Sequence, residues 1–341
     1  MSPPTAMYRE SAQAPEVVAR QLAENAVSAV RIGGLLRQLN PRVVITCARG
    51  SSDHAATYAK YLIETYTKTI TSSAAPSVAS VYDASPDMRG TLFIAISQSG
   101  RSPDLLAAVA GARERGAYVL ALCNSTDAPL AAAADALLPL WAGPEASVAA
   151  TKTFIASLSA LAQLLASWTQ SRELVNAVSR APEELARAWA CDWSAAVPLF
   201  ASATNLFVIG RGFGLGVAQE AALKLKETCA IHAEAFSAAE VKHGPMTLVR
   251  EGFPVLMLSQ SDETRAGLQS LAEEFAGRRA RVATAGFAIP EGLALPAIAA
   301  HPVIEPLLLI QSFYALANAV ALARGLNPDA PPHLNKVTET V

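Results

Sequence analysis

Three side chains that could transfer protons lie close together in the sequence: Lys224, Glu227 and His243. Glu227 ends the run AALKLKE, which is typical of an amphipathic helix, and His243 lies in KHGP, where glycine and proline indicate a loop. A carboxylate on a helix and an imidazole on a nearby loop are the groups that general acid–base chemistry on a sugar needs. A salt-bridged helix followed by a surface loop fits the same residues, so other segments must decide.

The composition favours a protein with two domains. The 341 residues are 52% hydrophobic and 16% charged, which allows a large core and exceeds one typical domain. The net charge is −2 and no basic run is present, so neither nucleic acid nor membrane is expected as a partner. The four cysteines form no CxxC pair and no metal spacing with the five histidines. We therefore expect no disulfide framework, no metal and a cytoplasmic location.

Two apolar features have simple structural interpretations. The N-terminus lacks a basic start followed by an apolar core, so we expect no signal peptide. The apolar stretch 307–323 is interrupted by polar residues and is short for a membrane span, which predicts a buried helix. Cys47 and Cys123 lie in apolar runs and are predicted to be buried.

The chain contains an internal repeat. VVITCARGSSDHAATYAKYLIE and LFVIGRGFGLGVAQEAALKLKE share a plan of strand, Arg-Gly turn and long helix, with Arg49 and Arg211 separated by 162 residues. Ser97 and Ser259, in TLFIAISQSG and FPVLMLSQSDE, have the same separation. A third strand pair, AYVLALC and ARVATAG, is separated by 163 residues. Three matches at nearly one spacing indicate a tandem duplication.

Each repeat reads strand, helix, strand, helix, strand, and this order predicts the fold class. The apolar runs VVIT, LFIAI and YVLAL are continuous rather than alternating, as in parallel strands that are buried on both faces. We predict an α/β fold made by tandem duplication of a doubly wound, flavodoxin-like parallel sheet. The expected parts are a helical lead-in, a first unit, a helical bridge, a second unit and a tail, at residues 1–40, 41–165, 166–200, 201–327 and 328–341.

Two loops rich in hydroxyl groups follow strands of the first unit, at the carboxyl ends where such sheets bind ligands. SQSGRS, residues 97–102, precedes a helix with Pro103 near its start, and its glycine lets the backbone approach a ligand. Gly50, Ser51 and Ser52 form a second, smaller loop. Hydroxyl donors beside helix N-termini suit a dianionic phosphate. Helix capping by serine would explain one such loop, whereas two adjacent loops favour phosphate.

The second unit differs at the matching positions. SQSDE, residues 259–263, carries Asp262 and Glu263, which would repel a phosphate, so we expect the ligand site in the first unit only. GRGFGLG, residues 210–216, resembles a dinucleotide-binding turn. Its glycines do not follow G-x-G-x-x-G and no acidic residue is suitably placed, which argues against NAD.

Taken together, these segments resemble the SIS (sugar isomerase) family, and nearly the whole chain is similar to the isomerase half of glucosamine-6-phosphate synthase. The matching strings are SQSG, AGPEASVAATKTF, ALKLKE, IHAEAF, VKHGP and the tail LNKVTETV. The resemblance implies a site for fructose 6-phosphate or glucosamine 6-phosphate that works without a metal or an organic cofactor.

The resemblance also implies a role for each site residue. Glu227 would shuttle a proton between C1 and C2, His243 would open the sugar ring from the partner subunit of a homodimer, and Lys336 would form a Schiff base with the open ketose. The serine loops would hold the phosphate, and Lys224 and backbone near the AGPEASVAATKTF string would complete the pocket. The implied substrate-binding residues are Ser51, Ser52, Ser97, Gln98, Ser99, Ser102, Val148, Ala149, Lys224 and Asn335.

Two departures from the synthase indicate a subfamily. The first cysteine, Cys47, lies in a predicted strand, so we expect no glutaminase domain in this chain and no ammonia drawn from glutamine. Arg101 follows SQSG where the synthase usually has an acidic residue, and the tail reads PPHLNKVTETV. SQSGRSPD and this tail look like those of stand-alone SIS-type glucosamine-6-phosphate deaminases. The role of Arg101 stays open.

We therefore predict a glucosamine-6-phosphate deaminase, a hydrolase of amino sugar metabolism. Glu227 would move the C2 proton to C1, and water, or Lys336 by imine exchange, would release ammonia. Three other functions stay open: a different aldose–ketose phosphosugar isomerase, a fructosamine-6-phosphate deglycase, and a sugar-phosphate sensor that binds without turnover. Purely structural roles also stay open, namely an ion pair of Glu227 with Lys224, a loop position for His243 and a frayed tail around Lys336.

Overall fold

The structure is a computed structural model that describes residues 4–336. The chain forms two compact units, each built around one five-stranded sheet. The first-repeat unit comprises Glu16–Glu145, Lys152–Arg180 and the described residues from 335 onward. The second-repeat unit comprises the described residues up to 15 together with Ala146–Thr151 and Ala181–Leu334. The units are interleaved in sequence, whereas the domain limits expected above are contiguous, and those limits stay a prediction.

The sheet of the first-repeat unit is parallel throughout, with the strand order β2-β1-β3-β4-β5. This is the flavodoxin-like order, in which the chain reverses direction across the sheet between β1 and β3. Its strands are β1 (Val43–Cys47), β2 (Ile70–Ser73), β3 (Thr91–Ser97), β4 (Tyr118–Cys123) and β5 (Ala136–Pro139).

The sheet of the second-repeat unit repeats this topology, with the parallel order β7-β6-β8-β9-β10. Its strands are β6 (Asn205–Gly210), β7 (His232–Ser237), β8 (Pro254–Leu258), β9 (Arg281–Ala285) and β10 (Leu293–Leu295). Two sheets of one topology confirm the predicted tandem duplication of a doubly wound α/β unit.

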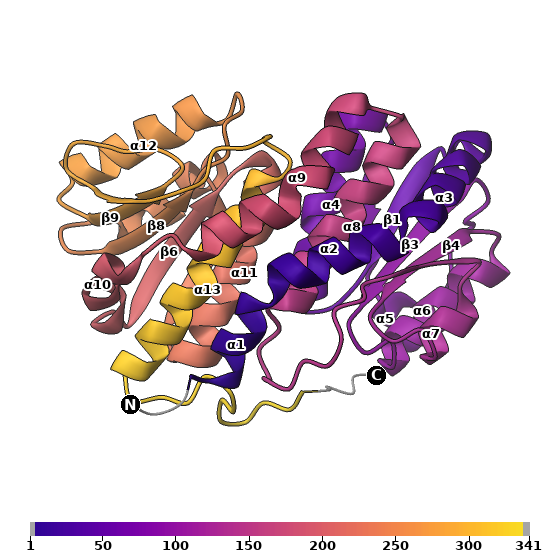
Figure 1. The fold of residues 1–341 in the computed structure, drawn as a ribbon, viewed down its shortest axis with the longest axis horizontal. Coiled ribbons are helices and arrows are strands. Elements are labelled where there is room, and N and C mark those ends of the chain that lie inside the picture. The colour runs from indigo at the N-terminus through magenta and orange to yellow at the C-terminus, as the bar shows by residue number, and fades with distance from the viewer. Residues whose placement is uncertain (1–3, 337–341) are drawn as a thin grey trace. The chain divides into compact units, whose positions relative to one another are not determined.

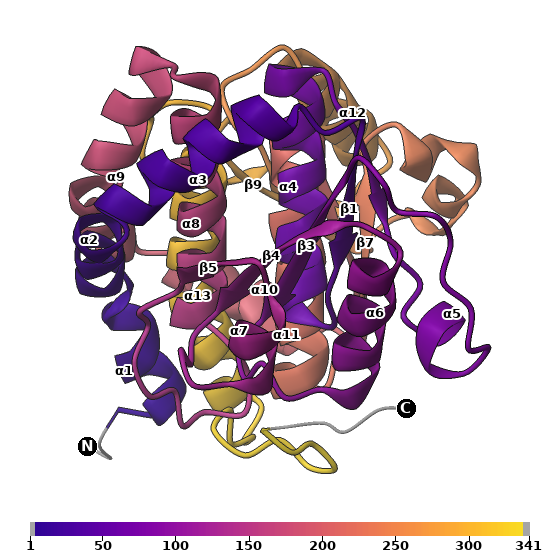
Figure 2. The ribbon, with the colours of Figure 1, turned by 90° about the vertical axis from the view of Figure 1, so that its right-hand side faces the viewer.

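Helices cover both faces of the first sheet (Figures 1 and 2). One face carries α3 (Ala26–Leu39), α4 (Ser51–Thr67) and α8 (Lys152–Thr169). The other carries α5 (Ser77–Ser80), α6 (Pro103–Glu114) and α7 (Pro129–Ala133). All seven residues of β3 are buried, as its continuous apolar sequence predicts for a strand covered on both sides.

The second sheet is covered in the same way, with α12 (Arg265–Gly277) on one face and α11 (Leu215–Cys229) with α13 (Glu305–Ala323) on the other (Figure 1). Short 3₁₀ turns follow β6 and β7. The remaining elements are α1 (Ala6–Ala12), α2 (Ala14–Glu24), α9 (Arg172–Trp189), α10 (Val197–Ala201), η1 (Ser194–Ala196), η2 (Gly212–Gly214), η3 (Glu240–His243) and η4 (Pro245–Leu248).

Helix α13 is the one helix among the described residues with the length and apolar composition to cross a membrane, and 78% of its most apolar window is buried inside the protein. This confirms the buried helix predicted for residues 307–323. Cys47 and Cys123 are buried at the ends of β1 and β4, also as predicted. Burial, with the nearby Asp104 carboxylate, raises the pKa of Cys47 to about 12.

Candidate active site

The larger serine loop connects β3 to α6 in the first-repeat unit. The Ser97 hydroxyl accepts a hydrogen bond from the backbone N–H of Gly100 at 2.9 Å, which folds the loop back toward the strand. Gly100 has φ +65°, and a Cβ there would come within 2.6 Å of Cys123 Sγ. Only glycine fits both constraints without strain, so the backbone of this loop can approach a ligand as the sequence predicts.

The hydroxyl groups of this loop are not used to cap α6. Ser102 is the N-cap residue, yet its side chain makes no capping hydrogen bond, and Pro103 occupies the first helical position. Ser99 Oγ accepts only a long contact of 3.4 Å from the N–H of Arg101. Gln98, Ser99 and Ser102 are all partly exposed. Simple serine capping therefore does not account for this loop, and its donors remain suited to an anion.

The smaller serine loop lies on the neighbouring strand, because β1 pairs directly with β3. Gly50, with φ +56°, is the N-cap of α4, so Ser51 and Ser52 begin that helix at its positive end. The carbonyl of Gly50 accepts from the N–H of Asp53 at 2.9 Å, which closes the first turn. Burial raises the pKa of Asp53, which weakens its negative charge beside this loop.

An ion pair joins the two serine loops. Arg49, just before the smaller loop, donates to Asp104 at 2.8 Å, and the Asp104 side chain is fully buried at the start of α6. A second oxygen of Asp104 accepts from the N–H of Leu105. Sequence reasoning used Arg49 only as a marker of the repeat and missed Asp104. An acidic residue directly after Pro103 was the available signal.

A cluster of three charged groups lies on α11 of the second-repeat unit. Lys224 Nζ lies 3.3 Å from a carboxylate oxygen of Glu220 and also forms an ion pair and hydrogen bond with Glu227. Burial alone lowers the pKa of Lys224, but the two carboxylates outweigh it, so the pKa is raised and the group is an ammonium. The Lys224–Glu227 pair considered as a structural alternative is therefore present, and Glu220 is an additional partner that the sequence reasoning missed.

Only Glu227 in this cluster reaches solvent. Its side chain is 22% exposed, whereas those of Lys224 and Glu220 are 1% and 0% exposed. Glu227 lines a pocket of about 300 Å³ together with Thr228, Leu326 and Pro331. A carboxylate that is fixed by a buried cation and open to a pocket can exchange protons with a bound molecule.

His243 ends the 3₁₀ turn η3, and Gly244 beyond it adopts φ +135° before Pro245 starts η4. Val241 is buried in the core of the second sheet and anchors the turn, while the His243 side chain is exposed. Within the described residues, His243 makes no hydrogen bond or ion pair, and none connects it to Glu227. Its expected role in ring opening stays a prediction.

The segment with Val148 and Ala149 is held by backbone contacts in the second-repeat unit. The N–H of Val148 donates to the carbonyl of Asp329 at 3.2 Å. The Glu10 carboxylate accepts from the N–H groups of Ala146 and Ser147, at 2.5 and 3.1 Å. Glu10 therefore shapes this loop from a distance of more than a hundred residues in sequence, and the sequence reasoning missed it.

Lys336 is held by an ion pair in the first-repeat unit. Its Nζ lies 3.0 Å from Glu145, whose side chain is fully buried and also accepts from the N–H and the hydroxyl of Thr153. The structure does not show a frayed end at this lysine, which is 25% exposed. Glu145 belongs to the AGPEASVAATKTF string, but sequence reasoning gave it no role. Asn335 beside the lysine is exposed.

The predicted site residues therefore form four groups. The serine loops lie together, Lys336 pairs with Glu145, Lys224 pairs with Glu227, and Val148 bonds to the segment before the tail. Groups of three or more His, Cys, Asp or Glu side chains that could hold a metal do not occur among residues 4–336.

Comparison with known proteins identifies the family. A family model of the SIS domain matches residues 39–167 and 199–285, one match in each repeat. The chain belongs to the SIS-domain family. Its relatives and structural neighbours include proteins named for isomerisation of phosphosugars and for amino sugar phosphates.

Three proteins illustrate the similarity. Glutamine–fructose-6-phosphate aminotransferase (isomerizing) from Aeropyrum pernix is 35% identical over 93% of this chain and 55% of its own length. The chain spans about half the length of the curated relatives it matches. A candidate phosphosugar isomerase from Silicibacter pomeroyi DSS-3 has a TM-score of 0.92 at 42% identity, covering 95% of this chain and 100% of that one. Glucosamine-6-phosphate deaminase from Thermotoga maritima has a TM-score of 0.77 at 24% identity, covering 98% and 100%, and this likeness concerns the fold.

Proposed function

We propose that the chain converts glucosamine 6-phosphate and water to fructose 6-phosphate and ammonia. The observation that carries the proposal is the charge cluster on α11, where the fully buried Lys224 holds the partly exposed carboxylate of Glu227 beside a pocket. Transfer of a proton between adjacent sugar carbons needs one base that is fixed in place and can both take up and return a proton. Glu227 has these properties.

The serine loops support a phosphosugar substrate. Their backbone N–H groups and hydroxyls lie at the starts of α4 and α6, where the helix dipoles favour an anion. The Arg49–Asp104 ion pair fixes the loops relative to each other. Phosphate held far from the reacting carbons supplies binding energy that positions C1 and C2.

The proposed reaction has three steps. His243 assists ring opening by proton transfer, which gives the open-chain aldose amine. Glu227 removes the proton from C2 and returns it to C1, so the C1 aldehyde becomes an alcohol and the C2 amine becomes an imine. Water adds to that imine and ammonia leaves, which produces the C2 ketone of fructose 6-phosphate. General acid–base steps of this kind contribute about 100- to 10,000-fold each.

Lys336 provides a second route for the last step. Its amine can replace ammonia at C2 by imine exchange, and water then releases the ketose from the lysine. The Glu145 carboxylate at 3.0 Å keeps the tail lysine at a defined position and can accept a proton when the amine becomes nucleophilic.

A phosphosugar aldose–ketose isomerase is the second function that an observation favours, since the candidate phosphosugar isomerase from Silicibacter pomeroyi shares 42% of its sequence with this chain. Both reactions use the same proton transfer. The deaminase additionally requires an amino group at C2, and the strings SQSGRSPD and PPHLNKVTETV support that choice by resemblance.

We further propose a homodimer in which His243 acts in the partner's site, because this histidine is exposed on a turn anchored by Val241. Mixing inactive Glu227→Gln and His243→Ala subunits tests this. If His243 acts across the interface, each mixed dimer has one intact site, and random exchange restores about a quarter of wild-type activity. If His243 acts within its own subunit, the mixture stays inactive.

The activity itself is tested by giving glucosamine 6-phosphate to the purified protein and following the sugar by NMR and ammonia by a coupled assay. Equal amounts of fructose 6-phosphate and ammonia support the deaminase. An altered sugar without ammonia supports the isomerase. Tight binding without any change in the sugar supports a sensor and refutes both enzymatic proposals.

A further inference from the structure

The loop after β8 in the second repeat matches the serine loop after β3 position by position. Each loop follows the central strand of its sheet and precedes a helix, α6 or α12. At a separation of 162 residues the second loop keeps hydroxyl or amide side chains at four positions, and the pairs are Ser97 with Ser259, Gln98 with Gln260, Ser99 with Ser261, and Ser102 with Thr264. The second repeat has therefore retained the donors of an anion site.

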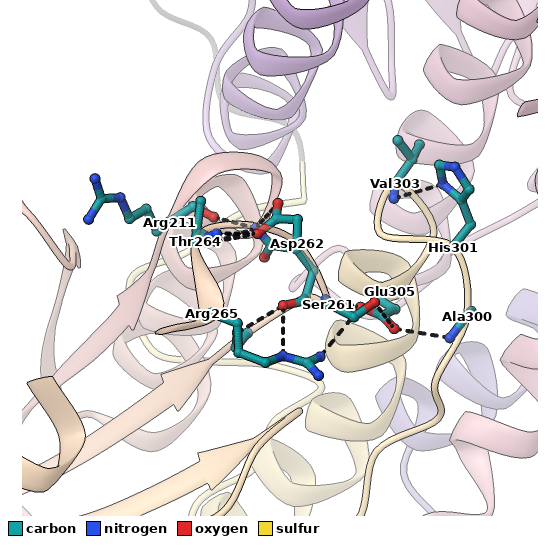
Figure 3. A network of polar contacts seen from close by, with 11 residues as sticks. Arg211, Ser261, Asp262, Thr264, Arg265, Ala300, His301, Val303 and Glu305 are labelled. Atoms are coloured by element: carbon teal, nitrogen blue, oxygen red, sulfur yellow. Dashed lines mark hydrogen bonds and ion pairs between the residues drawn. The ribbon is translucent and has the colours of Figure 1, made fainter. Parts of the chain in front are cut away.

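In the second repeat these donors bind a carboxylate of the chain itself (Figure 3). The N–H and the hydroxyl of Ser261 both donate to Glu305, the hydroxyl at 2.8 Å. The same carboxylate accepts from the N–H of Ala300 at 3.0 Å and lies 3.9 Å from the guanidinium of Arg265. Its side chain is only 4% exposed. Glu305 thus receives three donated hydrogen bonds and a cation, a set that an anionic ligand would need.

The rest of this loop is also satisfied internally. The Asp262 carboxylate accepts from the N–H and the hydroxyl of Thr264, at 2.9 and 2.5 Å, which is the position that matches Ser102. Gln260 lies over the turn that matches the smaller serine loop, since a Cβ on Gly214 would come within 2.5 Å of its Oε1. The first repeat has glycine where Asp262 stands and arginine where the exposed Glu263 stands.

We propose that Glu305 is a built-in anion that occupies, in the second repeat, the position that phosphate takes in the first. The chain therefore carries two copies of an anion-binding loop, one open to a ligand and one filled permanently by its own carboxylate. The inference does not depend on which reaction the protein catalyses.

The arrangement has a structural consequence for the candidate active site. Glu305 lies in the first turn of α13, so its bonds to Ser261 fix the start of this helix at the end of the second sheet without any ligand. Helix α13 packs along α11, where the thiol of Cys229 contacts the carbonyl of Ala317 at 3.4 Å. Helix α11 carries Lys224 and Glu227, so the filled loop supports the helix of the proposed base.

The test is rescue of a Glu305→Ala variant by inorganic phosphate. Thermal unfolding is measured in phosphate, sulfate and chloride at one ionic strength. All proteins also carry Ser99→Ala and Ser102→Ala, which removes hydroxyl donors from the first loop. Glu263→Ala is the matched control, because it removes one negative charge from the same loop at an exposed side chain without a recorded hydrogen bond.

We expect Glu305→Ala to lower Tm by about 5–10 °C in chloride, because three donors lose their acceptor. Phosphate and sulfate should restore about half of that loss or more, and they should leave the Tm of Glu263→Ala and of the protein with Glu305 intact unchanged. If Glu305→Ala folds too poorly, Glu305→Gln replaces it, with a smaller loss and the same selective rescue.

Three results would overturn the inference. One is an unchanged Tm for Glu305→Ala in chloride. The second is equal Tm values in chloride and phosphate for both Glu305 variants. The third is an equal gain from phosphate in all proteins, since this would place the response outside the loop after β8.

Discussion

Replacement of Lys224 by methionine is the perturbation whose effect the structure defines most clearly. Methionine keeps most of the length of the side chain but removes the ammonium that lies 3.3 Å from Glu220 and bonds to Glu227. Glu220 is fully buried, so its carboxylate would lose that cation in surroundings that solvate charge poorly.

The expected loss of stability follows from the burial of each pair. Removing one partner of a buried ion pair costs about 3–5 kcal/mol, because the other charge stays behind. The pair with Glu227 contributes less, since that carboxylate is 22% exposed. For a unit of this size, a loss of about 3–5 kcal/mol lowers Tm by about 6–20 °C.

The assay is thermal and urea unfolding of Lys224→Met beside the double variant Lys224→Met, Glu220→Gln. The double variant has no buried carboxylate at position 220, so it should recover more than half of the lost Tm, and the two changes should be strongly non-additive. Lys224→Met with wild-type stability would refute the reasoning. So would a double variant that is less stable than Lys224→Met.

Three further predictions follow from single contacts. The raised pKa of Lys224 stabilises the fold below the ordinary value of 10.5, and this stability is lost as the pH rises through the folded pKa, so urea midpoints should fall more steeply above pH 10.5 in the wild type than in the double variant; parallel curves would contradict this. Glu145→Gln removes the anion that holds Lys336, and borohydride trapping of the sugar on this lysine should drop about tenfold, as mass spectrometry would show; undiminished trapping would count against the contact. The Cys47 thiol, with a pKa of about 12, should resist a thiol reagent at pH 8 until the protein unfolds; labelling of the folded protein at the rate of a free thiol would be inconsistent with its burial.

The fold could be predicted largely from the sequence because its strands are buried on both sides. A continuous apolar run such as TLFIAIS fits few other environments, and the structure buries all seven residues of β3. The constant separation between Arg49 and Arg211 then required the second sheet to repeat the first, and both sheets have one strand order. The interleaving of the compact units was not predictable, because short segments such as Ala146–Thr151 carry no signal of the unit they join.

The residues that the sequence analysis missed are carboxylates with distant partners. Glu10, Asp104, Glu145 and Glu305 are each buried or nearly so, and each accepts hydrogen bonds from backbone or side chains of another element. Residue type indicates that such a group can accept bonds, but the donors are brought together only by the fold. The serine loops, by contrast, were found because their donors lie within six consecutive residues.

The central claim is that one carboxylate performs the chemistry on a sugar held elsewhere by its phosphate. The most direct measurement compares wild type and Glu227→Gln for binding of glucosamine 6-phosphate by calorimetry and for release of ammonia. The account predicts that Glu227→Gln binds the sugar within about threefold of the wild-type Kd and releases ammonia at least about 100-fold more slowly. Release of ammonia by Glu227→Gln at the wild-type rate would contradict it.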